Sequence, residues 1–170
     1  MPRIGSVVDA DIADILRRAG VGLVVSLPCA TLAGILAEID RLAVRRISVC
    51  REEEGVGIAA GAALAGTRAA LVMQNSGLGN CVNALASLTC FYRLPLFMLM
   101  SHRGGAGEKI AAQVPMGRAA PLLLDALSIG HLSVAGVSGL RSLEAFVRQT
   151  FDSGAAGAAF LSPELWDAQK

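Results

Sequence analysis

The residues best suited to chemistry are three consecutive carboxylates, Glu52, Glu53 and Glu54, followed by a segment of mostly glycine and alanine that ends at Gly66. Acidic residues in the first turn of a helix stabilise its dipole, and this structural explanation is sufficient for Glu53 or Glu54. Three adjacent like charges repel one another, however, so helix capping alone does not explain the run. The small residues behind it favour close packing of a flat ligand, another backbone or a partner subunit against this helix.

A second polar segment, Gln74 to Asn83 (QNSGLGNCVN), combines side-chain amides with paired glycines. Glycine lets the backbone approach a ligand closely, and a helix N-terminus of this kind can hold an anion. The segment is neither a dinucleotide fingerprint nor a phosphate-binding loop, because the third glycine and the lysine of those motifs are missing.

Cys29 follows Pro28 at the expected start of a helix. It is either a small residue in a tight turn or a thiol that takes part in a site. A cysteine nucleophile would need a general base, and the chain has only two histidines.

One of those histidines, His102, opens a long polar loop that runs from Ser101 to Arg118. Arg103, Lys109 and Arg118 in and beside this loop either clamp an anionic substrate or are surface charges.

The four polar segments each follow a short apolar run that is typical of a buried strand. Six such runs occur, at residues 21–27, 46–50, 69–73, 95–101, 131–135 and 158–161. Helical patterns accompany them at residues 9–19, 31–42, 53–66, 79–92, 117–127 and 139–151. This alternation predicts an α/β fold, a doubly wound, mainly parallel six-stranded sheet with helices on both faces. Ligands bind at the carboxyl ends of such strands, so the four segments are expected to meet there.

Composition narrows the function classes. The 170 residues fit one domain over 1–170, and 15 basic against 14 acidic residues give a net charge of +1, which argues against nucleic-acid binding. The longest apolar stretch, Gly57 to Gly66, is too short to cross a membrane, and the lack of a secretion leader predicts a cytoplasmic protein. The four cysteines have neither disulfide-framework nor zinc-like spacing, so we expect reduced thiols and no metal ligands from this chain.

Four stretches together carry a family resemblance, and they occur in order between about residues 7 and 130. They are Ser26–Cys29 (SLPC), Arg51–Gly66 (REEEGVGIAAGAALAG), Met73–Asn83 (MQNSGLGNCVN) and Ser101–Gly117 (SHRGGAGEKIAAQVPMG). The combination resembles the pyrimidine-binding domain of thiamine-diphosphate enzymes. Within that group it is most similar to the alpha subunits of sulfopyruvate decarboxylases, with the phosphonopyruvate decarboxylases as near relatives.

The resemblance implies a role for each matched position. The family's catalytic glutamate stands nine positions before a glycine that matches Gly61, which selects Glu52. This residue would share a proton with N1′ of the cofactor's aminopyrimidine ring and so activate the cofactor for attack on a 2-oxo acid. Pro28, Gly79 and Asn80 would lie close to the pyrimidine. The residues implied on the substrate side are Cys29, Gln74, Asn75, His102, Arg103 and Gln113, with His102 and Gln113 as further catalytic residues.

The resemblance also implies a partner. The Gly-Asp-Gly motif with which this family begins its diphosphate and Mg²⁺ site does not occur in the chain. A separate beta subunit with the diphosphate-binding domain would then hold thiamine diphosphate through Mg²⁺, in a hetero-oligomer with paired alpha subunits. The implied reaction converts 3-sulfopyruvate to sulfoacetaldehyde and carbon dioxide, a step of coenzyme M biosynthesis.

Three alternatives stay open. The substrate is phosphonopyruvate or another anionic 2-oxo acid, the chain is a non-catalytic regulatory or assembly domain of the same fold, or Cys29 is the nucleophile of a hydrolase.

Overall fold

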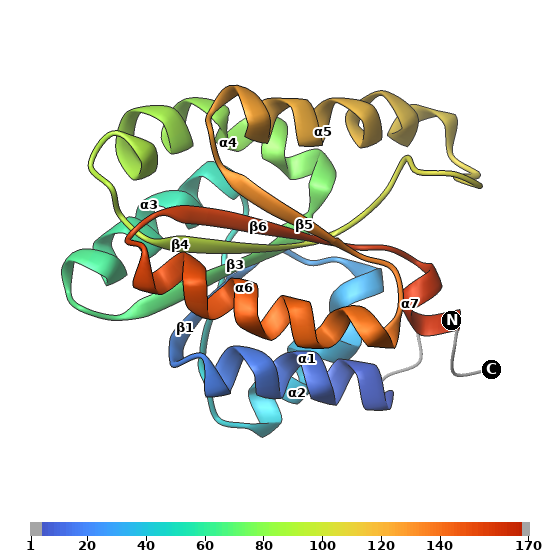
Figure 1. Ribbon diagram of the computed structural model, residues 1–170, viewed down its shortest axis with the longest axis horizontal. Coiled ribbons are helices and arrows are strands. Elements are labelled where there is room, and N and C mark those ends of the chain that lie inside the picture. The colour runs from blue at the N-terminus through green and yellow to red at the C-terminus, as the bar shows by residue number, and fades with distance from the viewer. Residues whose placement is uncertain (1–4, 168–170) are drawn as a thin grey trace.

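A parallel sheet runs through the middle of the computed structural model, which describes residues 5–167 (Figure 1). The strands found within those residues are β1 (Val21–Ser26), β2 (Arg45–Ser48), β3 (Arg68–Gln74), β4 (Leu96–Ser101), β5 (Gly130–Val134) and β6 (Ala156–Leu161). They pair in the order β2-β1-β3-β4-β6-β5, and every pairing is parallel. The predicted doubly wound, six-stranded α/β fold is therefore confirmed.

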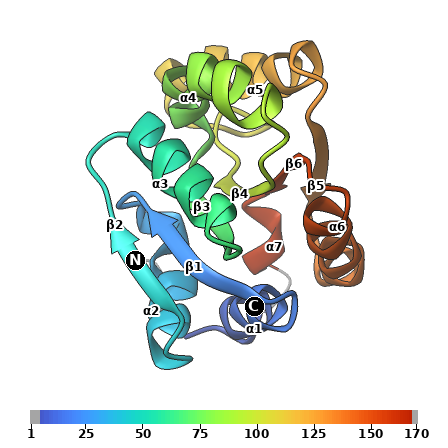
Figure 2. The same ribbon diagram turned by 90° about the vertical axis from the view of Figure 1, so that its left-hand side faces the viewer.

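Helices cover both faces of the sheet (Figures 1 and 2). The first layer consists of α1 (Val7–Arg18), α2 (Ala33–Arg41) and α6 (Leu140–Asp152). The second layer consists of α3 (Glu52–Leu64), α4 (Leu78–Ala84) with the π-helical turn Leu85–Cys90, and α5 (Val114–Ala126). The short helix α7 (Glu164–Asp167) follows β6. Each layer encloses its own apolar core against the sheet, so the side chains of the central strands are buried on both sides.

Burial on both faces explains why the central strands are recognisable as continuous apolar runs. All residues of β4 are buried, as are the five inner residues of β3. The edge strand β2 differs, since its residues are exposed or half-buried, and its ladder stops at Ser48 rather than at the predicted Cys50.

Helix ends follow ordinary capping chemistry. Ser6 and Asp9 form a reciprocal capping box at the start of α1, and Gly20 follows the helix with φ +80°. Helix α5 begins at Val114, three residues before the predicted start, because Pro115 fits the first turn, where no backbone N–H is needed.

The strands end at one edge of the sheet. Gln74 of β3 lies opposite Ser101 of β4, which in turn lies opposite Leu161 of β6. The loops that follow these residues consequently share one side of the molecule. Within residues 5–167, no helix is long and apolar enough to span a membrane.

Candidate functional site

The three adjacent carboxylates have three different surroundings. Glu53 accepts a hydrogen bond from Arg51 Nε at 2.6 Å, and this bond lowers the pKa of Glu53. Glu54 folds back to the preceding loop and accepts the backbone N–H of Cys50 at 3.4 Å. Glu52 instead reaches from the start of α3 to α4, where its Oε2 accepts a 2.8 Å hydrogen bond from Asn80 Nδ2. Of the three glutamates, Glu52 is therefore the one whose side chain links α3 to another helix, α4.

Glycines shape the surroundings of Glu52. A Cβ atom on Gly77 would overlap the Glu52 carboxylate, so a larger residue at that position would displace Glu52 from its observed place. Gly79, two residues further on, is exposed and lies beside Met116 of α5. Asn80 holds one carboxylate oxygen, whereas Oε1 makes no hydrogen bond within the described residues. One oxygen of a fixed, half-buried carboxylate is thus left for a ligand.

The thiol nearest to this carboxylate is inert. Burial raises the pKa of Cys81 to about 12, and the negative charges of Glu52 and Glu53 add to the shift. Cys81 therefore stays protonated at neutral pH and takes no part as a nucleophile.

Two of the predicted substrate-side amides, Gln74 and Gln113, meet where β3 ends and α5 begins. Gln74 Nε2 donates to Gln113 Oε1 at 3.1 Å and also contacts the hydroxyl of Ser76. Both glutamines are half-buried, so they form a polar wall that still reaches solvent.

Asn75 points inward rather than outward. It is fully buried, its Oδ1 accepts the N–H of Arg103 at 3.0 Å, and its Nδ2 donates to the carbonyl of Arg103 at 2.9 Å. Both ends of the amide are occupied, so Asn75 fixes the loop backbone, and a direct contact with a substrate would cost these two bonds.

The Arg103 guanidinium is paired with Glu108, a residue that sequence reasoning missed. Nε and Nη2 of Arg103 donate to the two carboxylate oxygens at 2.7 and 2.8 Å. The only sequence signal for this pair is an acid five positions after an arginine within a glycine-rich loop. Arg103 is therefore a held cation, not a freely moving one.

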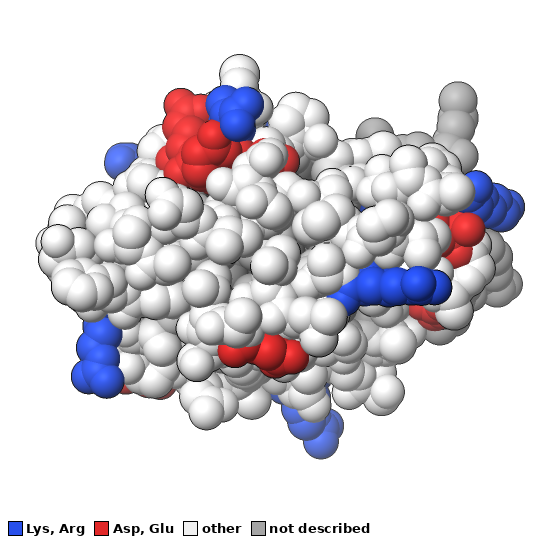
Figure 3. Space-filling model, turned by 90° about the horizontal axis from the view of Figure 1, so that it is seen from above, with Lys and Arg blue, Asp and Glu red and all other residues white. Residues whose placement is uncertain are grey.

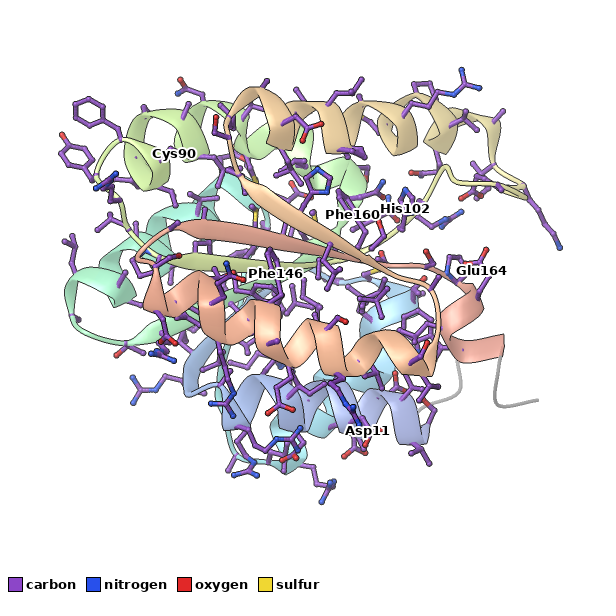
Figure 4. The ribbon with its side chains drawn as sticks, viewed as in Figure 1. Asp11, Cys90, His102, Phe146, Phe160 and Glu164 are labelled. Carbon is purple, nitrogen blue, oxygen red and sulfur yellow. The ribbon has the colours of Figure 1, made fainter. Side chains whose placement is uncertain are left out.

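His102 lies at the carboxyl end of β4, beside Phe160 of β6 (Figure 4). The two ring centroids are 5.3 Å apart. The backbone N–H of His102 donates to the carbonyl of Leu161 at 2.8 Å, which fixes the start of the loop. Its Nε2 is buried and has no hydrogen-bond partner in the part of the chain that the structure describes.

Pro28 and Cys29 line an open hollow of about 460 Å³ between α2 and the ends of β1 and β2. Cys29 packs on the first-layer core, on the opposite side of the sheet from α3, and its Sγ lies 3.4 Å from Ser101 Oγ. A serine hydroxyl is no general base, so this contact does not support Cys29 as a hydrolytic nucleophile.

The predicted residues thus form neighbouring groups along one edge: Glu52 with Gly79 and Asn80, Gln74 with Gln113, Asn75 with Arg103, and Cys29 with Pro28 on the far side. No group of three or more histidine, cysteine or acidic side chains within residues 5–167 is arranged to hold a metal ion. The arrangement offers a carboxylate with one oxygen free, together with a pair of side-chain amides, which suits a bound ring system more than a metal.

Comparison with known families agrees with this geometry. Residues 7–129 match the model of the thiamine pyrophosphate enzyme N-terminal TPP binding domain. That match spans α1 to the end of α5 and includes every site residue named above.

Individual relatives are similar over two thirds or more of this chain. The sulfopyruvate decarboxylase subunit alpha of Methanothermobacter thermautotrophicus is 50% identical over 115 residues, which cover 67% of this chain and 70% of that protein. The sulfopyruvate decarboxylase of Methanosarcina acetivorans is 34% identical over 159 residues, 94% of this chain and 41% of that protein. A phosphonopyruvate decarboxylase of Streptomyces viridochromogenes is 39% identical over 118 residues, 68% of this chain and 30% of that protein.

Among solved structures, a 2-oxoglutarate:ferredoxin oxidoreductase from Magnetococcus marinus superposes with a TM-score of 0.66 at 13% identity. The match covers 92% of this chain and 29% of that one, and at this identity it supports the fold alone.

Proposed function

The chain belongs to the thiamine pyrophosphate enzymes, and from that premise we propose that it is the alpha subunit of a decarboxylase that acts on 3-sulfopyruvate. The products would be sulfoacetaldehyde and carbon dioxide, in coenzyme M biosynthesis. The observation that carries the proposal is the position of Glu52, held by Asn80 with one oxygen free.

The residues around Glu52 fit the aminopyrimidine of thiamine diphosphate. Gly77 leaves room for the carboxylate itself, and the exposed Gly79 presents bare backbone beside it. Glu52, Gly79 and Asn80 would hold the ring, and Pro28, which lines the hollow beside α2, would reach it from the far side. When bound, thiamine diphosphate supplies the electron sink that 2-oxo acid decarboxylation needs.

The chain itself would contribute the carboxyl group that shares a proton with the cofactor and the amide side chains that line the substrate side. Glu52 holds a proton at its free carboxylate oxygen and shares it with the ring nitrogen, while Asn80 keeps the carboxyl group from rotating. Gln74 and Gln113 would line the substrate side. His102 would join them from the same loop once its ring turns, because its unpartnered Nε2 is buried in the chain itself. A site of this kind orients the reactants and excludes water.

A partner would complete the site. The relative from Methanothermobacter thermautotrophicus is named an alpha subunit, and the relative from Methanosarcina acetivorans is much longer than the region it shares with this chain. These facts support a partner subunit. We propose that it is a beta subunit that holds the diphosphate through Mg²⁺, in a hetero-oligomer with paired alpha subunits. The small residues of α3 and the exposed Leu64, Phe91 and Leu122 of the second layer would lie against neighbouring chains.

The decisive experiment replaces the proton-holding carboxyl group. In the complex with its partner, Glu52→Gln should lower sulfopyruvate decarboxylation by roughly 10²–10⁴-fold, because an amide of the same shape cannot share the proton. Carbon dioxide release measures the rate, and gel filtration checks that the complex still assembles. Glu54→Gln is the matched control two positions away, and it should leave the rate nearly unchanged.

Turnover that survives Glu52→Gln would favour the non-catalytic regulatory or assembly role. Similarity to a phosphonopyruvate decarboxylase keeps phosphonopyruvate as the second candidate substrate. A kcat/KM higher for phosphonopyruvate than for sulfopyruvate in the wild-type complex would select it.

A further inference from the structure

Glu108 is the one carboxylate of the loop between β4 and α5, and it is heavily hydrogen-bonded. Its two oxygens accept two bonds from Arg103, one from the N–H of Gly104 at 3.1 Å and one from the N–H of Ile110 at 3.0 Å. The side chain is 9% exposed. Arg103 and the two backbone N–H groups hold the pKa of Glu108 well below its usual range. Glu108 is therefore ionised at all physiological pH values and is bound entirely within its own loop.

Arg103 is fixed at both ends by these contacts. Asn75 bonds its backbone N–H and carbonyl, and Glu108 binds one edge of its guanidinium group. The pKa of Arg103 is raised, mainly by its hydrogen bonds to Glu108. Nη1 makes no hydrogen bond within residues 5–167, so the outer edge of the group is free to donate.

The loop backbone behind this pair cannot shift easily. Gly104 has φ +83°, and a Cβ atom there would overlap the carbonyl oxygen of Gln113. A Cβ atom on Gly117 would lie 2.6 Å from the carbonyl oxygen of Arg103. The loop therefore rests directly on the start of α5, and the position of Gln113 is coupled to that of Arg103.

We propose that Glu108 is a positioning residue for substrate selection: it grips one edge of Arg103 so that the opposite edge faces the distal anionic group of the 2-oxo acid. The inference rests on the proposed function, because the anion it explains is the sulfonate of sulfopyruvate. A guanidinium group held by a bidentate carboxylate loses little further freedom when an anion binds its outer edge. Glu108 acts through Arg103 and does not touch the substrate.

The test compares two 2-oxo acids that differ in the distal anion. With the assembled complex, Glu108→Gln should raise KM for sulfopyruvate roughly tenfold or more and change kcat little, since a charged contact is misaligned. The KM or inhibition constant of pyruvate, which has no distal anion, should stay the same. Arg103→Gln should raise KM for sulfopyruvate at least as much, and adding Glu108→Gln to it should have no further effect. Glu164→Gln, an exposed acid after β6, is the control.

Equal changes in KM for sulfopyruvate and for pyruvate would show that Glu108 has only a structural role and would overturn the proposal. A lower KM for sulfopyruvate would also overturn it, because Glu108 would then compete with the substrate for Arg103. Glu108→Asp keeps the charge but shortens the reach, and it should give an intermediate KM.

A second readout does not need the reaction. In the chain by itself, Glu108→Gln should speed amide hydrogen exchange at Gly104 and Ile110, and unchanged exchange would contradict the grip on the loop. If the wild-type complex does not decarboxylate sulfopyruvate, the proposed function fails, and the exchange result still decides whether Glu108 fixes the loop.

Discussion

The two helical layers that cover the sheet differ in how many charged residues their helices carry. In the first layer α1, α2 and α6 each carry several charged residues, and Arg18 of α1 pairs with Glu144 of α6 at 2.9 Å. In the second layer, α4 and its π-helical turn carry no charge, and α3 has none after Glu54. Figure 3, which looks down on this side over α4 and α5, is accordingly mostly uncharged.

The difference fits a first layer that faces solvent and a second layer that meets the proposed partner. In the first layer, the start of α1 is capped and an ion pair links α1 to the neighbouring α6. The second layer leaves Leu64 76%, Phe91 74% and Leu122 67% exposed, and it contains the carboxylate that begins α3. A layer that carries both the carboxylate proposed to be catalytic and unburied apolar side chains is what a site shared between two chains would require.

The largest expected effect tests this proposed contact directly. A side chain at Gly61 meets nothing within 4 Å in the chain itself, so Gly61→Gln should stabilise the isolated chain, by about 0.5–1 kcal/mol of helix propensity. The same side chain should weaken binding to the partner by about 100-fold or more, because it would keep the two surfaces apart. Thermal unfolding and sedimentation with the partner measure the two effects. Ala145→Gln on α6 is the control that should leave assembly intact.

An intermediate effect is expected from the first layer, on stability alone. Asp9 is buried, completes the capping box with Ser6, and accepts a 3.0 Å bond from Trp166 Nε1. Asp9→Ala should lower the free energy of unfolding by about 2 kcal/mol, without changing partner binding. Denaturant titration followed by the fluorescence of Trp166 measures the loss. The exposed neighbour Asp11→Ala should cost less than about 0.5 kcal/mol.

The smallest effect concerns the ion pairs of the first layer. Arg18 and Arg148 lower the pKa of Glu144, so the folded state binds its proton less readily than the unfolded chain does. The stabilisation is present above the ordinary value of 4.5 and is lost as the pH falls through the lower folded pKa. Glu144→Gln should therefore lower the unfolding temperature slightly at neutral pH and not at all in strong acid. A difference that persisted in acid, or that grew with added salt, would contradict this assignment.

Much of the fold was predictable because the sheet is buried on both faces. The apolar runs of β3 and β4 locate those strands to within one residue at each end, since no polar residue is tolerated inside them. The edge strand β2 and the start of α5 were predicted less well, because exposed ladders and proline-containing first turns leave weaker patterns.

The site was predictable only as a set of loops. Residue types and spacing predicted that the three glutamates, Gln74 and His102 lie at one edge, and the family resemblance selected Glu52. Neither carried information on side-chain direction. The inward turn of Asn75 and the grip of Glu108 on Arg103 arise from contacts between segments that only the folded backbone brings together. The roles of Asn75 and Glu108 are therefore visible only in the folded structure.

The bond between Trp166 and Asp9 joins the last helix to the first. Because these two helices adjoin, the described part of the fold can be closed by a linker between them and reopened at a surface turn. The turn at residues 153–155, between α6 and β6, lies at the opposite end of the strands from Glu52. The layout of the site is thus independent of where along the sequence the chain begins, and circularly permuted versions would present the same carboxylate to the same neighbour.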